Sequence, residues 1–382
     1  MAPVETGDLV RELRTARGWS QGRLAAELND ACGTALTREY VSGWERGKVR
    51  PGPFYLRALA QVFDVPQAAL DAGRPGRRAA VRAGGAAGGR APAATAAALA
   101  PAVTSDLLGL GFAARLRGGP SADDWEARLA AYGTDYMSSP AADLQRRVAE
   151  DLVVVQQQLD EPAMWSAAAR LMTVYATTFS RQESARSIHW FRTAAEAADR
   201  SGDVGVRVWV RGRGALALGY GGTSTGLADL LADQALALTD KPSVGLLHAT
   251  LGKAYAAALR GDRATALHLA DRARRIFDAA YDPSARLSDY SIPAWRMNGF
   301  LSLLSARLGD EKQSAKARET ALSELPERLP RFVTHLELHK SLTLVRSGDR
   351  EGGLACARAA LDALPQERWC GTLQMLMAEI AA

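Results

Sequence analysis

Four Gly-Asp pairs punctuate the C-terminal part of this chain, and they constrain its fold more than any other feature. They are Gly202-Asp203, Gly261-Asp262, Gly309-Asp310 and Gly348-Asp349. Between them, apolar residues recur at every third or fourth position, and strand-like alternation is almost absent. Glycine can end one helix in the left-handed conformation and aspartate can cap the next, so each pair suits a tight turn between helices. The pattern therefore predicts an all-α fold for residues 105–382.

The spacing of the pairs indicates a repeated unit of two helices. In one unit, Leu251, Gly252 and Tyr255 precede the Gly-Asp pair, and Ala266 and Ala273 follow it. This unit resembles a tetratricopeptide repeat, although its first helix is longer and its period exceeds the usual ~34 residues. The resemblance implies a C-terminal α-solenoid of helical hairpins in which small residues let paired helices approach closely.

The excess positive charge lies entirely at the start of the chain. Residues 1–90 hold 14 Lys or Arg and 9 Asp or Glu, whereas the remaining residues hold 33 of each kind. A polyanion would be bound at that end, although a solvated surface with a basic linker is the alternative. Residues 73–104 include RPGRRAAVRAGGAAGGRAPAATAAALAP and no aromatic side chain. We expect a flexible basic linker there, between domains at residues 1–72 and 105–382.

Residues 1–72 have the apolar spacing of five short helices. Ser20 is placed to cap the second helix, and Thr37 to cap the third. The last two helices are expected over residues 51–65 and 66–71. The inward side chains that we expect to form the core are Leu13, Leu24, Ala25, Leu28, Val41, Trp44 and Leu59.

The segment S-Q-x-x-L-A followed by V-S-x-W-E-R-G-K resembles the XRE-type (Cro/phage-repressor) helix-turn-helix. The resemblance implies a five-helix domain that binds double-stranded DNA as a dimer through a recognition helix at residues 37–46. The turn at residues 29–36 departs from the family because it is longer and includes Cys32. Asn29 stands where the family has glycine, and we expect it to adopt the left-handed turn.

The resemblance also assigns contacts with DNA, residue by residue. Gln21 is expected at a backbone phosphate, Arg38 at the O6/N7 edge of guanine and Glu39 at cytosine N4, although Glu39 could equally be a surface carboxylate. Three basic residues after the recognition helix are expected to hold phosphates. The predicted DNA-binding set is Gln21, Thr37, Arg38, Glu39, Ser42, Arg46, Lys48 and Arg50.

Patterns for catalysis or metal binding are weak. His335 and His339 would share a helical face, but no Glu directly follows the first and no third ligand lies nearby, so we expect ordinary residues of a repeat helix. Cys356 and Cys370 lack the spacing of a zinc knuckle. Three scattered cysteines favour a reducing compartment, and no apolar run is long enough to span a membrane. We therefore expect a cytoplasmic protein that is not an enzyme and has no cofactor or metal.

The helical domain is a candidate for effector binding or dimerisation, because solenoids present a concave face. Arg213, Arg296 and Gln157 could hold an acidic or polar ligand. Seven aromatic residues could line a cavity, although such residues at helical spacing are usually core: Trp165, Trp190, Trp209, Tyr220, Tyr255, Trp295 and Phe300. A helix-turn-helix before such repeats resembles the peptide-pheromone regulators of Gram-positive bacteria. Those receptors hold peptides with asparagines, and here only Asn29 and Asn298 occur.

Together these features predict a sequence-specific transcriptional regulator, a homodimer that reads a two-fold symmetric operator through residues 37–46. The repeat domain would bind a small-molecule or peptide effector or mediate dimerisation. Two alternatives stay open: a tetratricopeptide-like interaction scaffold with weak or non-specific DNA binding, and a peptide-pheromone receptor. The high use of Ala, Arg and Gly is typical of an actinobacterial genome.

Overall fold

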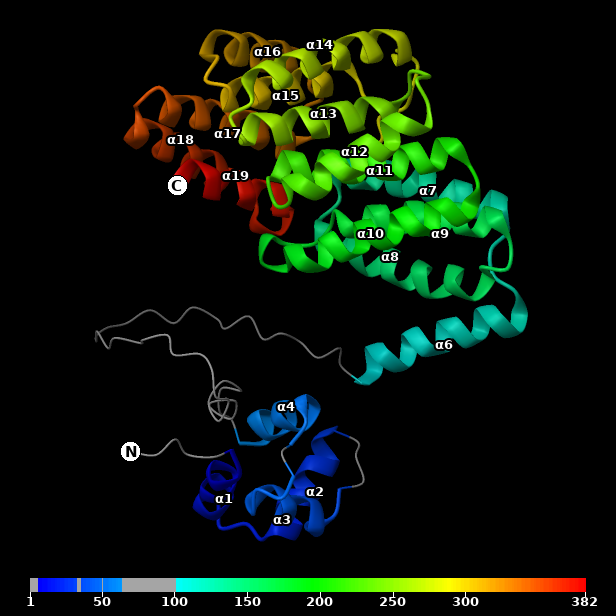
Figure 1. Cartoon of the computed structure of the whole chain (residues 1–382), viewed down its shortest axis with the longest axis vertical. Coiled ribbons are helices and arrows are strands. Elements are labelled where there is room, and N and C mark those ends of the chain that lie inside the picture. Colours follow the sequence, from blue (N-terminus) through cyan, green and yellow to red (C-terminus); the bar gives the residue numbers. More distant parts are fainter. Residues whose placement is uncertain (1–5, 33–35, 50, 64–100) are drawn as a thin grey trace. The chain divides into compact units, whose positions relative to one another are not determined.

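The computed structural model describes residues 6–32, 36–49, 51–63 and 101–382. The chain divides into two compact units, Met1–Ala94 and Thr95–Ala382. In Figure 1 the helices of the first unit are blue, and those of the second run from cyan to red. Within the described ranges every regular element is a helix. The expected all-α fold is confirmed.

The N-terminal unit contains four described helices: α1 (Thr6–Ala16), α2 (Gln21–Cys32), α3 (Arg38–Glu45) and α4 (Pro53–Val62). Ser20 caps α2 as expected, because its Oγ accepts a hydrogen bond from the backbone N–H of Arg23 at 3.1 Å. Thr37 has the extended backbone of an N-cap before α3, but its side chain makes no capping hydrogen bond to the helix, so the expected side-chain cap is not formed. The fourth helix is shorter than the expected span of 51–65, and the expected fifth helix lies outside the described residues.

The core of this unit joins all four helices. Leu24, Leu28, Val41 and Leu59 are fully buried, and Leu13 is half-buried at the edge of the cluster. Ala25 and Trp44 are also buried, and Val10, Leu36, Leu56, Ala58 and Phe63 complete the core. The third- and fourth-residue spacing of these side chains gives each helix one apolar face, which fixes the opposite face of α3 toward solvent.

The lengthened turn is built differently from what the sequence predicts. Asn29 lies inside α2, which continues to Cys32, so the expected left-handed turn at this residue is wrong. Its side chain instead bridges to the chain that enters α3. The Asn29 Oδ1 accepts from the Leu36 backbone N–H at 2.7 Å, and its Nδ2 donates to the Leu36 carbonyl at 2.9 Å. The amide thus replaces a tight turn with a side-chain clamp across the insertion.

The C-terminal unit consists of helices joined by short connections and by one longer irregular segment, residues 281–293. The helices are α6 (Pro101–Arg117), α7 (Ala122–Ser138), α8 (Ala141–Val155), α9 (Pro162–Ala176), α10 (Ser184–Ser201), α11 (Val204–Gly221), α12 (Thr225–Leu238), α13 (Val244–Leu259), α14 (Arg263–Ala280), α15 (Ala294–Arg307), α16 (Glu311–Glu324), α17 (Pro330–Arg346), α18 (Arg350–Asp362) and α19 (Gly371–Ala381). Because α6 begins at Pro101, the expectation that the linker reaches residue 104 is wrong; proline suits the first position of a helix. Residues 73–100 of the expected linker lie outside the described ranges.

The four Gly-Asp pairs act as the sequence predicts. Each glycine has a positive φ, between 69° and 102°. Each aspartate caps the helix that follows: the side chains of Asp203, Asp262, Asp310 and Asp349 accept from the backbone N–H groups of Val206, Thr265, Gln313 and Gly352. The last three pairs each join the two helices of a hairpin: α13 to α14, α15 to α16, and α17 to α18. The first pair joins two successive hairpins, from α10 to α11.

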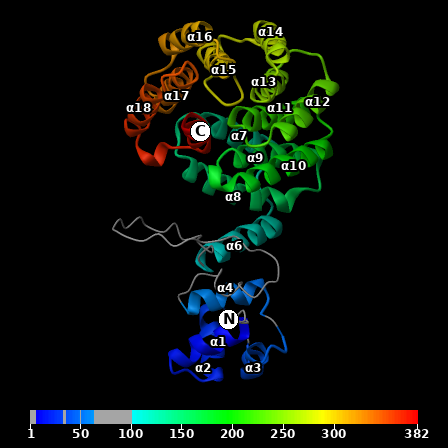
Figure 2. The same cartoon turned by 60° about the vertical axis from the view of Figure 1, so that its left-hand side comes forward.

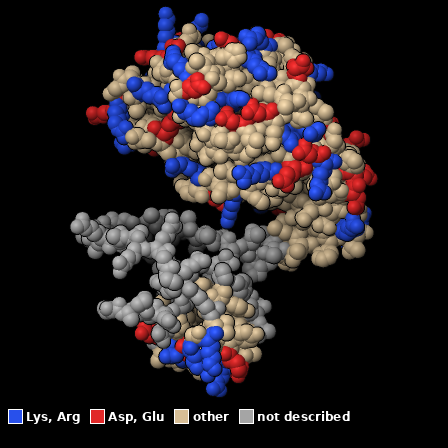
Figure 3. Space-filling view, viewed as in Figure 1, with Lys and Arg blue, Asp and Glu red and all other residues tan. Residues whose placement is uncertain are grey.

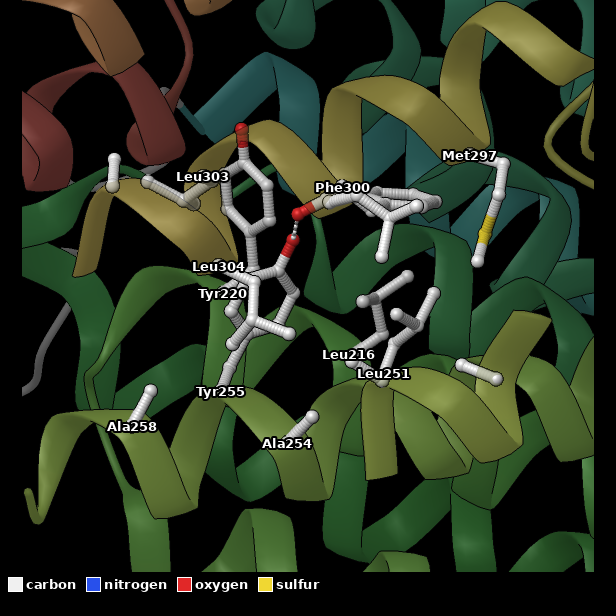
Figure 4. Packing of buried hydrophobic residues seen from close by; sticks show 14 of the residues in the cluster. Leu216, Tyr220, Leu251, Ala254, Tyr255, Ala258, Met297, Phe300, Leu303 and Leu304 are labelled. Atoms are coloured by element: carbon white, nitrogen blue, oxygen red, sulfur yellow. Dashed lines mark hydrogen bonds between the residues drawn. The ribbon is translucent and has the colours of Figure 1, made fainter. Parts of the chain in front are cut away.

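The hairpins stack side by side and curve, so that α19 lies inside the arc (Figure 2). There α19 packs against α11, α17 and α18. Glycines bring α11 and α13 together, since a Cβ on Gly212 would lie 2.0 Å from the carbonyl oxygen of Gly245. Figure 4 shows the core beside this crossing, where the hydroxyl of Tyr255 donates to the carbonyl of Phe300 at 2.6 Å. The curvature places the first helices of several hairpins around a common interior.

Candidate DNA interface and interior cavity

The outward face of α3 carries the residues predicted to read DNA. Val41 and Trp44 point into the core, so Arg38 and Glu39 lie on the exposed side of the first turn, next to exposed Thr37. Hydrogen bonds from the Thr37 hydroxyl and from its own backbone N–H lower the pKa of Glu39. Its carboxylate is therefore an acceptor, which is the chemistry that a cytosine amino group requires.

A buried carboxylate fixes α3 against α1 and α2. Glu45 accepts from Arg14 Nε at 2.6 Å and from Gln21 Nε2 at 2.7 Å, and Arg11 donates to its backbone carbonyl. Burial opposes ionisation of Glu45, but the hydrogen bonds from Arg14 and Gln21 and the charges of Arg14 and Arg11 outweigh it and lower the pKa. Charge-assisted bonds of this kind hold geometry closely, so the pose of α3 is tied to both neighbouring helices.

The remaining residues predicted to contact DNA differ in their exposure and in the hydrogen bonds that they already make within the protein. Gln21, expected at a phosphate, donates its amide to Glu45, and the phosphate contact stays a prediction. Ser42 is half-buried, and its carbonyl accepts from Arg46 Nε at 3.1 Å. Lys48 is exposed. Arg50 lies outside the described residues. In Figure 3, Lys and Arg side chains gather at the tip of the N-terminal unit, with acidic groups beside them.

Two features of this surface were not predicted from the sequence. Tyr40 is 57% exposed beside Arg38 and Glu39, and an aromatic ring there can contact sugar or base edges. Its only sequence signal is an aromatic residue at an outward helical position. Glu45 was part of the W-E-R-G-K motif, but the motif alone did not show that its carboxylate points inward.

The C-terminal unit encloses a partly open cavity of about 120 Å³. Its walls come from α7 to α11 and from α15, α17 and α19, which face the interior of the arc. Of the predicted aromatic residues, Tyr220, Trp295 and Phe300 line it, together with Arg213 and Arg296. The others are not part of its lining: Gln157, Trp165, Trp190, Trp209 and Tyr255. Most of those rings pack in the core between helices, as the alternative interpretation expected.

One wall of the cavity holds a buried cluster of charges. The carboxylate of Asp289 accepts from Arg213 Nε at 2.7 Å and from Arg296 Nη2 at 2.7 Å. Burial would raise the pKa of Asp289, but the charges of Arg213 and Arg296 outweigh it and lower that pKa. Asp289 lies between α14 and α15, and its backbone N–H donates to the carbonyl of Gly133 in α7 at 2.9 Å. The cluster therefore joins segments far apart in the sequence.

A second polar group lines the cavity between α11 and α17. The hydroxyl of Tyr220 lies 3.2 Å from His335 Nδ1 and 2.9 Å from His339 Nε2. Cys370 Sγ lies 3.8 Å from His335 Nε2 and 3.0 Å from the hydroxyl of Thr372. Burial opposes the thiolate, but the hydrogen bond and charge of His335 lower the pKa of Cys370 to about 6. Burial also lowers the pKa of His339 well below its usual range.

Among the residues that the structure describes, no three His, Cys, Asp or Glu side chains gather in a way that could hold a metal ion. Within the same ranges, no helix combines the length and apolar character needed to cross a membrane.

Residues 10–66 match the family model described as helix-turn-helix. The four described helices, the exposed face of α3 and this match define the class of the N-terminal unit. It is a helix-turn-helix DNA-binding domain of the XRE type, as the sequence resemblance implied. The match supports a DNA-binding transcriptional regulator, and it does not extend to the C-terminal unit.

Among solved structures, the chain is similar to PlcR of Bacillus thuringiensis in complex with the peptide PapR7 and DNA. The two are 12% identical, the match covers 88% of this chain and 98% of the PlcR chain, and the TM-score is 0.31. No curated protein matches this chain.

Proposed function

We propose that this protein is a sequence-specific transcriptional regulator that acts as a homodimer, reads a two-fold symmetric operator through α3, and binds an effector in its C-terminal unit. The observation that carries the DNA-reading part is the placement of α3. Buried Glu45 anchors the helix from behind, while Arg38 and Glu39 stand exposed on its first turn. A helix that is rigidly held and has charged side chains at its outward N-terminal end suits the major groove.

The experiment is selection from random and genomic DNA fragments by the full-length protein at physiological salt. The selected sites should contain a two-fold symmetric motif with half-sites about one DNA turn, or a multiple of it, apart. Arg38→Ala should weaken binding by about 1–3 kcal/mol and relax one position of each half-site. Arg38→Lys keeps the charge but loses the bidentate fork, so it should relax the same position with a smaller loss of affinity.

The opposite result favours the interaction scaffold that the sequence left open. A scaffold would bind DNA weakly, would lose it as salt rises, and would select no motif. In that case neither Arg38→Ala nor Arg38→Lys would change the preference for any sequence, and the sequence-specific regulator would be abandoned.

The dimer proposal rests on the outer face of α6. Leu108, Phe112 and Leu116 follow one another at intervals of four residues, so they form a single stripe along the helix. Their exposed fractions are 59%, 68% and 81%. Gly111 and Ala114 lie on the other side, where Gly111 faces Val153 of α8. A second copy of this helix would cover the stripe in an isologous contact.

The doubly substituted protein Phe112→Ser, Leu116→Ser tests this interface by light scattering after gel filtration. We expect the wild-type protein to be a dimer and the variant to be a monomer with weaker operator binding, because each head then binds one half-site alone. Val333→Ser, which replaces an exposed apolar residue on α17, is the matched control and should stay dimeric. A monomeric wild-type protein, or a variant that remains dimeric, would refute the α6 interface.

A further inference from the structure

The lining of the cavity has an unbalanced charge. Among the described residues, its lining includes three arginines, Arg213, Arg296 and Arg331, and no Asp or Glu. Asp289 lies behind the first two and neutralises one positive charge. Arg331 forms no ion pair within the described part of the chain; its guanidinium donates to the Tyr136 carbonyl. The interior therefore holds three guanidinium groups for one carboxylate, in surroundings where an unbalanced charge is unfavourable.

One hydrogen-bond donor of this group has no partner among the described residues. Arg296 is 5% exposed, and its Nη2 is bonded to Asp289. Its Nε is buried and bonds to no atom of the described residues. Buried polar atoms in native proteins nearly always have a partner. The guanidinium of Arg296 is part of the cavity lining and lies over the Phe300 ring, so an acceptor in the cavity would complete its hydrogen bonding. An anionic oxygen would supply both the missing acceptor and part of the missing charge.

The rest of the lining is apolar and rich in flat rings. Trp295, Phe300 and Phe332 contribute rings beside the arginines, and Phe179 and Phe191 contribute rings from α9–α10. Rings of this kind pack against another aromatic body in offset or edge-to-face contact. An inorganic anion would leave these surfaces uncovered, whereas a ring that carries an anionic group would use both parts of the site.

The size of the cavity limits its occupant. Its volume of about 120 Å³ is close to the roughly 150 Å³ of an engineered cavity that binds benzene. A single ring with a carboxylate is the body that this volume matches, and the partly open mouth leaves room for a larger ring system to extend outward. An extended peptide backbone needs a groove with amide partners, and no asparagine is part of the lining.

We propose that the cavity between α11, α15, α17 and α19 binds a small aromatic carboxylate, with its ring against Trp295 and Phe300 and its carboxylate toward Arg296 and Arg331. This deepens the proposed function, because it names the chemical class of the effector assigned there to the C-terminal unit. Arg331 is the arginine best suited to a test. It is half-buried and pairs with no carboxylate among the described residues, so its replacement leaves no buried carboxylate without a partner; its charge does help to lower the pKa of the Cys370 thiol.

The test is isothermal titration of the full-length protein with two matched pairs of probes: benzoate with benzamide, and 2-naphthoate with 2-naphthamide. Each pair differs only in the anionic group. We expect the carboxylate of at least one pair to bind tenfold or more tightly than its amide. Arg331→Gln should reduce that ratio to threefold or less, and Arg331→Lys should retain an intermediate preference because it keeps the charge.

Arg358→Gln, an exposed arginine of α18 outside the cavity, is the control and should bind like the wild-type protein. Equal affinity for acid and amide, a preference unchanged in Arg331→Gln, or no binding of any probe at about 1 mM would overturn the proposal. Binding of a mixture of short random peptides in place of the probes would overturn it as well. The same preparation is also tested for selection of DNA sites. A protein that selects a motif but binds no probe would contradict the ligand proposal alone and leave the proposed DNA binding intact.

Discussion

The two units place their charged side chains in opposite ways. On the N-terminal unit, Arg38 and Glu39 are exposed on the outward face of α3. In the C-terminal unit, Arg213, Asp289 and Arg296 form a cluster in which no member is more than 5% exposed. Composition hides this difference, because the chain after residue 90 has equal numbers of basic and acidic residues. Equal totals of basic and acidic residues in this part of the chain therefore allow an excess of positive charge in its interior.

Because of this difference, removing a charged side chain should affect DNA binding in one unit and stability in the other. An exposed charge keeps its hydration, so its loss should change the affinity for a polyanion and leave the free energy of unfolding nearly unchanged. A buried charge has lost its water, so its loss exposes an uncompensated partner and should reduce stability first. Glu45 is the exception in the N-terminal unit, since its buried side chain supports an exposed surface.

The largest effect is expected for Asp289→Asn. Two buried guanidinium groups would lose the one carboxylate that pairs with them in the described part of the chain. The free energy of unfolding of the C-terminal unit should therefore fall by about 3–5 kcal/mol. Urea unfolding followed by tryptophan fluorescence measures it. The control is Asp271→Asn, an exposed aspartate paired with Arg274, for which we expect a change within about 0.5 kcal/mol. Equal stability of Asp289→Asn and the control would break the contrast between buried and exposed charge.

The next effect concerns the buried exception in the N-terminal unit. Glu45→Gln removes the charge that Arg14 and Arg11 face, and we expect a loss of about 1–3 kcal/mol because Arg14 remains partly solvated. Hydrogen exchange of the α3 amides should report the loosened helix, and operator affinity should fall with it. Glu27→Gln removes the half-buried partner of exposed Arg23 and should leave the exchange unchanged. Unaltered protection of α3 in Glu45→Gln would contradict an anchoring role.

The sequence predicts the elements better than the interior that they enclose. Capping residues and Gly-Asp turns act within a few positions of the chain, so Ser20 and the four aspartate caps could be assigned from local pattern alone. The lengthened turn could not, because the side chain of Asn29 bonds to Leu36 across an insertion that the family pattern lacks. Local rules predict a glycine-like turn there, and a side-chain clamp replaced it.

The lining of the cavity could not be predicted by such local rules, because it depends on how the helices are arranged in space. Arg213, Arg296 and Arg331 come from three helices, and they meet only because the stacked hairpins curve around one interior. Helical spacing shows that each side chain can face inward, but not which of them share a wall. Asp289 lies in a segment between helices, where the apolar pattern gives no signal, so the carboxylate that holds the cluster was not anticipated.

A third prediction uses pH to separate a buried group from an exposed one. His248 is fully buried, and burial together with the charges of Arg213 and Arg296 lowers its pKa well below the usual range, opposed by Asp289. In the unfolded chain His248 is protonated as the pH falls below about 6.5, whereas in the folded chain it stays neutral. Stability from this group is therefore complete above that pH and is lost as the pH falls below it, by up to about 1.4 kcal/mol per pH unit.

His248→Leu should remove this contribution. We expect a shallower decrease in the free energy of unfolding between about pH 7 and pH 5, without loss of stability at pH 7, because neither ring nitrogen has a partner among the described residues. Urea unfolding at several pH values measures the slope. His268→Leu, on the exposed side of α14, is the control and should keep the wild-type slope. An equal slope in His248→Leu would show that this histidine does not stay neutral.

The smallest expected effect concerns Lys48, which is exposed after α3. If it holds a phosphate, Lys48→Ala should weaken binding about equally for every DNA sequence and reduce the slope of log affinity against log salt by about 1. Its free energy of unfolding should change by no more than about 0.5 kcal/mol. Titrations of operator and random DNA at several salt concentrations measure both properties. A change in the preference between the two DNAs would mean that Lys48 reads bases, because phosphate contacts carry no sequence information.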